Sequence, residues 1–422
     1  MSDISYLINK LWPVYRSLTG NGNRKTLNII KEYLPELQIT EVPSGERIFD
    51  WIVPDEWNIK DAYIITPSGE KIADFKKNNL HVVGYSSPLN KEVSLDELKK
   101  HLFTLPETPN AIPYKTSYYN KSWGFCITHN EYSKLKEGIY KVVIESEFKQ
   151  GALSYGEYIK KGTSKKEFIF STYICHPSLA NDNLSGIILN TLLAKKISTI
   201  KTRYSYRFLF TPETLGTLCW LNNNKIHLKN VTGGYVITCV GDNGSFRYKK
   251  SKQGNNFIDN IAIKTLQQKS TNFIIEDYFP FGSDERQFNS PGFNLNFGSL
   301  MRTRYNMYKE YHTSKDNLEF ISESNINESL SIYFELIRNI EHETLYENKM
   351  PFGEPQLGKR KLYFQKNIYS DSNTIHNALI WILSYGDGNL SLEDISEISQ
   401  LPLSSIHKAA EMLKKNNLIE KY

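Results

Sequence analysis

Polar and ionisable residues gather just after the predicted strands of this 422-residue chain. His176 and Asp182 follow a buried-strand pattern over residues 167–175, and His312 lies in a loop after the last predicted strand. Because the carboxyl ends of parallel strands meet at one edge of an open α/β sheet, we expect these side chains to converge. Two imidazoles and a carboxylate form a ligand set that suits a zinc ion.

Two further loops of the same kind carry carboxylates. Glu213 follows a predicted strand over 204–210, and Asp242 follows another over 233–240. Each ligand candidate also has an ordinary explanation, since His176 could serve as a hydrogen-bonding loop residue and Asp182 as the N-cap of the next helix. Their joint occurrence at successive strand ends favours the metal site.

Strands and helices alternate in the part of the chain that carries these loops. This rhythm predicts an α/β fold with a mixed, mostly parallel sheet covered by helices, built from residues 1–44 and 136–345. Residues 45–135 form short β-type runs between turn signals and are interpreted as an inserted β-rich subdomain. Residues 346–422 are predicted to form a linker and three helices with helix-turn-helix spacing.

The bulk composition excludes several classes of protein. A formal net charge of +5, spread along the chain, argues against a dedicated nucleic-acid or membrane surface. The four cysteines form no C-x-x-C pair, which indicates reduced thiols rather than a zinc knuckle. No leader pattern and no run of about 18 apolar residues is present, so a soluble, cytoplasmic protein is expected.

The combined segments HPSLANDNLSG, FTPETLG and EYHTSKD resemble the metal-binding motifs of the clan of zinc aminopeptidases and glutaminyl cyclases. More narrowly, the chain resembles the aminopeptidase-like proteins of bacterial surface-polysaccharide loci, and the resemblance covers essentially its whole length. It implies a zinc-aminopeptidase-like domain with an inserted β subdomain and a C-terminal winged helix.

The resemblance also implies roles for single residues. It makes His176, Asp182 and His312 zinc ligands and Glu213 the general base. The chain departs from the family where Thr214 replaces a second glutamate that binds the other zinc.

A second departure concerns the last acidic ligand, whose strand-end position is held by Thr238 or Cys239. Asp242 lies a few residues beyond that position and is the one candidate ligand for a second zinc ion. One Zn²⁺ with an open fourth position is therefore expected, with two as the alternative.

The expected activity is zinc-dependent hydrolysis of an amide or peptide bond in a small peptide or amino-sugar derivative. The alternatives are a single-zinc acyl-transfer or cyclase enzyme, and a non-catalytic scaffold or regulator that zinc stabilises. Asp316 is expected to orient the ligand His312. Residues expected to line the substrate cleft are Asp284, Glu285, Arg286, Arg302, Arg304 and Tyr311.

The C-terminal helix over 403–416 carries a modest basic set, namely His407, Lys408, Lys414 and Lys415. DNA binding requires several phosphate contacts, which this surface does not supply. A protein partner, or dimerisation through this domain, is expected instead.

Overall fold

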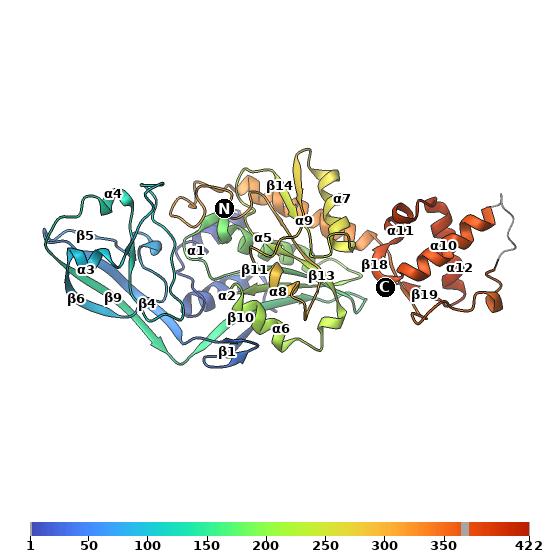
Figure 1. The fold of residues 1–422 in the computed structure, drawn as a ribbon, viewed down its shortest axis with the longest axis horizontal. Helices are drawn as coiled ribbons and strands as arrows, with labels where there is room; N and C mark the ends of the chain where they lie inside the picture. Colours follow the sequence, from blue (N-terminus) through green and yellow to red (C-terminus); the bar gives the residue numbers. More distant parts are fainter. Residues whose placement is uncertain (1, 364–370, 422) are drawn as a thin grey trace.

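The structure, a computed structural model, describes residues 2–363 and 371–421 and has three lobes in a row (Figure 1). A central α/β domain lies between a β-rich lobe and a small C-terminal domain. The predicted fold class is confirmed, because a large mixed sheet packed between helices forms the central lobe.

The central sheet has eight strands in the order β1–β10–β12–β11–β13–β16–β14–β15. The pairs of β11 with β12 and β13, and of β13 with β16, are parallel, so the carboxyl ends of these four strands meet at one edge. The strands are β1 (Gln38–Pro43), β10 (Ala152–Lys160), β11 (Glu167–Tyr173), β12 (Ser205–Thr211), β13 (Val231–Ile237), β14 (Phe246–Lys249), β15 (Phe273–Glu276) and β16 (Phe297–Met301). The last of these parallel strands, β16, begins only at Phe297, because Phe293 and Asn294 close a turn on Ser290.

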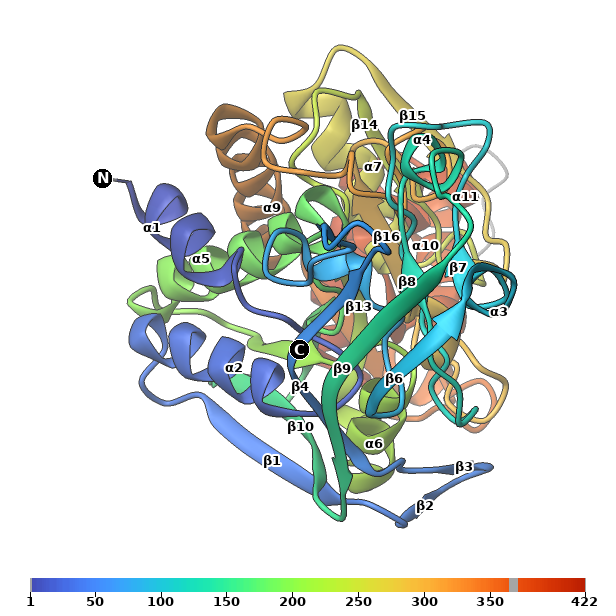
Figure 2. The ribbon, with the colours of Figure 1, turned by 90° about the vertical axis from the view of Figure 1, so that its left-hand side faces the viewer.

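Helices cover both faces of this sheet (Figure 2). Alternating residues of β11 point to opposite faces, so Phe168 and Phe170 enter one core and Ile169 enters the other. The first core packs on α1 (Asp3–Leu11), α2 (Asn21–Tyr33), α5 (Gly186–Ser198), α7 (Phe257–Lys269) and α9 (Glu323–His342), and the second on α6 (Leu215–Asn223) and α8 (Glu285–Phe288). In the described part of the chain, none of the helices combines the length and apolarity needed to span a bilayer.

The β-rich lobe is built on a four-stranded sheet in the order β5–β4–β9–β6. The expected boundary at residue 135 falls too early, because β9 pairs with both β4 and β6 and so belongs to this sheet. Its elements are β2 (Arg47–Ile48), β3 (Trp51–Ile52), β4 (Glu56–Ile65), β5 (Lys71–Ile72), η1 (Asn79–His81), β6 (Leu89–Ser94), α3 (Leu95–Lys99), β7 (Leu102–Phe103), β8 (Phe125–Cys126), α4 (His129–Tyr132) and β9 (Ile139–Lys149). We call residues 45–149 the insert.

The C-terminal domain combines three helices with a three-stranded sheet in the order β18–β17–β19. The linker predicted at the start of residues 346–422 is wrong there, because β17 pairs with β18 and β19 and so closes the domain. The elements are β17 (Leu345–Asn348), η4 (Gly358–Arg360), α10 (Asp371–Tyr385), β18 (Asp387–Ser391), α11 (Leu392–Ser399), α12 (Leu403–Lys415) and β19 (Ile419–Lys421).

Candidate metal centre and active site

The structure brings His176, Asp182 and His312 together at the carboxyl edge of the central sheet. One donor atom from each lies within 4.8 Å of the other two. His176 follows β11, and Asp182 lies in the kinked turn η2 (Ala180–Ser185) that leads into α5, where its own backbone is not helical. The three residues that the strand-end pattern selected therefore meet in space.

Two atoms of this group are placed to bind a metal ion. His312 Nε2 and Asp182 Oδ2 lie 3.0 Å apart, and neither has a hydrogen-bond partner among the described residues. Buried polar atoms normally have hydrogen-bond partners, so two unpartnered metal-binding atoms that face each other require an explanation. A metal ion bound by nitrogen and oxygen would satisfy both atoms at once.

The protonation states also suit a metal centre. Burial lowers the pKa of His176 to about 4, so that its imidazole is neutral at physiological pH. Burial would raise the pKa of Asp182, but electrostatic attraction to the nearby imidazoles of His176 and His312 outweighs it and lowers that pKa to about 2. A neutral imidazole and an ionised carboxylate are the forms in which these residues bind metals.

The second oxygen of Asp182 is already occupied. Tyr173, the last residue of β11, donates its hydroxyl proton to Asp182 Oδ1, and the same hydroxyl lies 2.6 Å from Thr238 Oγ1. Thr238 thus contacts the tyrosine where related sites are expected to offer an acidic ligand. Of the Asp182 carboxylate, Oδ2 alone is free of hydrogen bonds.

Asp316 holds the loop that carries Asp182. Its carboxylate accepts hydrogen bonds from the backbone N–H groups of Asn181, at 2.6 Å, and Asp182, at 3.0 Å. The expected contact with the His312 ring is not among these bonds. The face of that ring is instead covered by Tyr311, which stacks on it with 3.9 Å between the ring centroids.

Glu213 lies beside the three candidate ligands, with its Oε2 4.0 Å from His176 Nε2. Its backbone N–H donates to the Sγ of Cys175, which is buried, and Cys175, His176 and Glu213 form a second group of close donor atoms. Burial, followed by the charges of Asp284 and Asp182, raises the pKa of Glu213. A carboxylate with a raised pKa next to a metal centre is suited to accepting a proton.

Asp284 contacts the backbone beside Glu213 rather than the open cleft. It accepts hydrogen bonds from the Thr214 N–H, at 2.7 Å, and the Thr217 hydroxyl, at 2.8 Å, and so caps the start of α6. Burial raises the pKa of Asp284 to about 7. Thr214 itself has a φ of 63°, a conformation rare for a β-branched residue, which Asp284 helps to hold.

Four predicted site residues are engaged by other partners, and one of them, Glu285, is buried in an ion pair with Lys249. Asp242 is enclosed by hydrogen bonds from Asn181 Nδ2, the Gly244 N–H and the Thr303 hydroxyl, at 2.6 to 2.8 Å, so both of its oxygens are occupied.

The two arginines expected in the cleft serve the packing of other elements. Arg302 is buried and bonds Ser329 Oγ and the Gly244 carbonyl, each at 3.0 Å. Arg304 pairs with Glu276 at 3.3 Å. Neither guanidinium is turned toward the histidines' donor atoms, since both are engaged elsewhere.

The insert forms a wall of the centre, which the sequence did not reveal. Tyr114 donates its backbone N–H to the His312 carbonyl at 2.8 Å, and Ser314 donates to the Ile112 carbonyl at 2.8 Å. The Tyr114 ring lies 5.4 Å from the His176 ring and 5.2 Å from the His312 ring, measured between centroids. This two-bond ladder fixes the insert against the segment that carries a candidate ligand.

Arg16 supports the centre from the opposite side. It is fully buried, and its guanidinium donates to the His176 carbonyl at 3.0 Å and to the Leu11 carbonyl at 2.7 Å. Burial lowers the pKa of Arg16 to about 10. A lone arginine between two helices gave no signal in the sequence, because its partners are backbone atoms.

Several pockets are lined by residues of the insert, and one of them reaches Glu213. That pocket measures about 550 Å³ and is lined by Leu18, Trp51, Tyr118, Tyr119, Glu213, Thr214, Leu215, Arg286 and Gln287. It has the size of a small-molecule site. Arg286, expected in the cleft, does line it.

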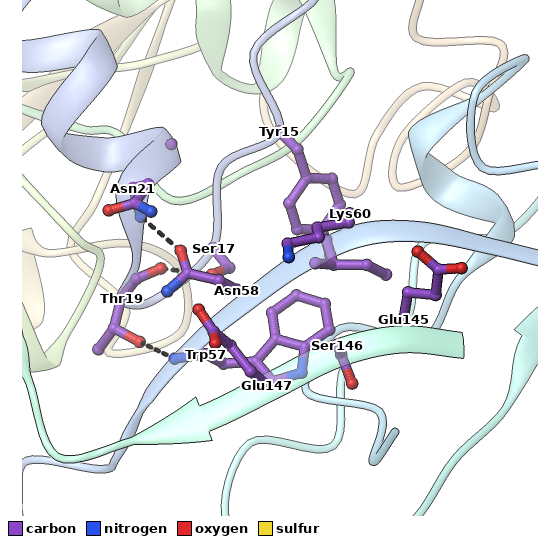
Figure 3. Close-up of a pocket in the computed structure, with 12 residues that line it drawn as sticks. Tyr15, Ser17, Thr19, Asn21, Trp57, Asn58, Lys60, Glu145, Ser146 and Glu147 are labelled. Atoms are coloured by element: carbon purple, nitrogen blue, oxygen red, sulfur yellow. Dashed lines mark hydrogen bonds between the residues drawn. The ribbon is translucent and has the colours of Figure 1, made fainter. Parts of the chain in front are cut away.

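Another pocket, of about 360 Å³, lies where the N-terminal segment meets the insert (Figure 3). Backbone N–H groups of Asn21 and Trp57 donate there to Asn58 Oδ1 and Thr19 Oγ1. None of its described lining residues is a histidine or a cysteine. We therefore place the chemistry at the edge that holds His176 and Glu213.

Comparison with known proteins agrees with this fold. The family model described as "domain of unknown function (DUF4910)" matches residues 5–343, and a winged helix-turn-helix model matches residues 344–421. A Clostridium acetobutylicum protein named "putative polysaccharide biosynthesis protein with aminopeptidase-like domain" is 48% identical, over 99% of this chain and 96% of its own length.

Solved structures show the same architecture. A crystal structure of a "putative peptidase" from Clostridium acetobutylicum has a TM-score of 0.81 at 47% identity, over 100% of this chain and 96% of the other. BSAP, a zinc aminopeptidase from Bacillus subtilis, has a TM-score of 0.60 at 12% identity, over 80% of this chain and 94% of its own. The chain therefore belongs to the DUF4910 family, in which an aminopeptidase-like α/β domain is followed here by a winged helix-turn-helix domain.

Proposed function

We propose that this protein is a zinc-dependent hydrolase that cleaves an amide bond, with one ion held by His176, Asp182 and His312. The proposal depends above all on two atoms, His312 Nε2 and Asp182 Oδ2, which lie 3.0 Å apart and have no hydrogen-bond partner among the described residues. The zinc aminopeptidase fold of BSAP supports the choice of metal. A zinc ion bound there would acidify water and polarise the substrate carbonyl.

The residues of the chain itself account for the proton transfers. Glu213 lies close enough to His176 to accept a proton from the attacking water, and it can return that proton to the leaving amine. Asp284 fixes the backbone next to Glu213, and Tyr173 fixes the carboxylate of Asp182. Tyr114 and Tyr311 cover the histidine rings and restrict access of bulk water.

The proposed substrate is a peptide or amino-sugar amide. The name of the 48% identical relative supports a role in polysaccharide biosynthesis. We further propose that the winged helix-turn-helix domain binds a protein, or a second copy of the chain, rather than DNA.

The test replaces Glu213 by Gln in the full chain, with Glu319→Gln as the control because Glu319 is an exposed carboxylate in the segment that follows His312. Zinc is measured by elemental analysis, and turnover is followed on alanine p-nitroanilide and N-acetylglucosamine. We expect both variants to keep one zinc per chain and Glu213→Gln alone to lose turnover by a factor of about 10² or more. Wild-type protein without zinc, or full turnover in Glu213→Gln, would contradict the proposal.

A further inference from the structure

The pocket beside Glu213 continues into a larger one. The larger pocket measures about 800 Å³ and shares Trp51 and Gln287 with the 550 Å³ pocket, so the two adjoin. We call the combined hollow the aromatic trough. Its walls carry the rings of Phe49, Trp51, Tyr118, Tyr119 and Phe293.

The rings of the trough are accessible. Trp51 is 41% exposed and Tyr119 is 50% exposed, and their ring centroids lie 6.3 Å apart at an angle of 45°. The Tyr119 hydroxyl donates to the Ile52 carbonyl at 2.6 Å, which ties its ring to the hairpin that carries Trp51. Large apolar side chains held open at a pocket mouth indicate a surface for a ligand.

The trough is net positive even with the Glu213 carboxylate counted. Its other ionisable groups are one carboxylate, Asp50, and three cations, Lys225, Lys229 and Arg286. Arg286 is exposed, and the nearest hydrogen-bond partner that the described residues give it is Thr214 Oγ1, at 3.5 Å. Its guanidinium thus remains free to bind an anion beside the proposed reaction site.

This arrangement discriminates between substrates. An ammonium group next to the scissile bond would need a carboxylate, and in the 550 Å³ pocket the one carboxylate is that of Glu213. A ligand carboxylate, in contrast, meets the Arg286 guanidinium, whose planar fork matches it. A six-membered ring attached to that carboxylate can lie against Trp51 and Tyr119.

We propose that the aromatic trough binds a ring-bearing carboxylate, with Arg286 holding the anion and Trp51 and Tyr119 packing on the ring. The inference rests on the proposed hydrolase for the position of the scissile bond. It makes the substrate an acidic amide rather than a peptide with a free amino terminus. The ring is either an aromatic ring or a pyranose, because both present an apolar face.

Binding is measured by calorimetry on the full chain, with two matched pairs of probes. Hippurate and hippuramide carry a phenyl ring with and without a carboxylate, and glucuronate and glucose do the same for a pyranose. We expect the acid of at least one pair to bind about tenfold more tightly than its neutral partner, as a charged hydrogen bond requires. The pair that shows the preference identifies the ring.

Substitutions test whether the tighter binding of the acids takes place in the aromatic trough. Arg286→Gln should abolish it and Arg286→Lys should keep part of it, whereas Lys60→Gln, in the separate 360 Å³ pocket, should leave it unchanged. Trp51→Ala should weaken the binding of both members of the preferred pair. Because Trp51 is exposed, the free energy of unfolding should change little.

Two results would overturn the inference: equal binding of acids and neutral partners, or faster turnover of alanine p-nitroanilide than of its N-succinyl derivative. Neither result bears on the hydrolase itself, which is judged by zinc content and by the loss of turnover in Glu213→Gln. Conversely, tighter binding of the acids by a protein that hydrolyses no amide would contradict the proposed hydrolase but support the proposed binding site.

Discussion

The hydroxyl of Tyr173 donates to Oδ1 of Asp182, which leaves Oδ2 of that carboxylate facing His312. A carboxylate that bridges two ions usually offers one oxygen to each of them. We therefore expect one zinc per chain in the wild-type protein. Tyr173→Phe should keep this stoichiometry but weaken zinc binding about 10- to 100-fold in chelator competition, because the carboxylate loses its orienting partner. Two zinc ions in the wild-type chain would contradict this.

Asp316 should matter for folding as well as for metal binding, since it holds the backbone of Asn181 and Asp182. Asp316→Asn should lower the free energy of unfolding by about 1–3 kcal/mol. Excess zinc should stabilise the variant less than the wild type, because only the folded site binds the ion. Melting temperatures with and without zinc check this, with the exposed Asp277→Asn as control. An unchanged zinc effect in Asp316→Asn would refute it.

The pH dependence of stability should report on the junction between the insert and the central domain. Glu56 of β4 accepts two hydrogen bonds from Arg24 of α2, which lower the pKa of Glu56 from 4.5 to about 2. A depressed pKa in the folded state stabilises the protein above pH 4.5, and this stabilisation is lost as the pH falls toward 2.

Glu56→Gln should therefore lower the free energy of unfolding at pH 7 by about 1–3 kcal/mol, and the deficit should shrink between pH 4.5 and pH 2. Urea unfolding at several pH values measures it. Glu32→Gln, an exposed substitution on the same helix α2, serves as the control. A deficit that does not change with pH would mean that the ion pair is not its source.

The four cysteines should be inert in the native protein, because all are buried. Burial raises the pKa of Cys126 and of Cys219 to about 12, and it also raises that of Cys175 beside Glu213. Thiolates are the reactive form, so a thiol titration should show slow reaction in buffer and four groups in denaturant. Rapid native modification of one thiol would show that its surroundings open.

The C-terminal domain should bind DNA weakly. On the exposed side of α12, Lys408, Lys414 and Lys415 are accompanied by Glu411, and Glu420 follows on β19. We expect no duplex binding tighter than about 10 μM at roughly 150 mM salt. Replacing the three lysines by Gln should change nothing. A steep salt dependence that the triple variant flattens would instead establish a phosphate-binding surface.

Much of the fold was predictable because strand-end loops leave a local signature. Polar residues directly follow the apolar runs of β11 and β12, so the meeting of His176 and Glu213 could be predicted from their positions alone. Domain boundaries were less accessible. The polar, half-exposed sequence of β9 does not reveal which of two sheets it joins, and its partners β4 and β6 decide this.

The walls of the site were not predictable, since their partners are distant in the sequence. Tyr114 reaches His312 across nearly two hundred residues, through backbone atoms that carry no side-chain pattern. Tyr173 reads as one more apolar residue of a buried strand, although its hydroxyl binds Asp182. Arg302 and Asp242 were predicted to belong to the site because their residue types are common in binding sites. In the structure they stabilise packing and a loop instead.

The ladder between residues 112–114 and 312–314 joins the insert to the segment of the central domain that carries His312. A designer who transplanted the insert from a relative, or deleted it, would also release the backbone on which His312 is mounted. The insert and the segment that carries His312 are therefore structurally coupled, and neither can be exchanged alone. Specificity and metal retention in this architecture would have to be re-engineered together, as one module.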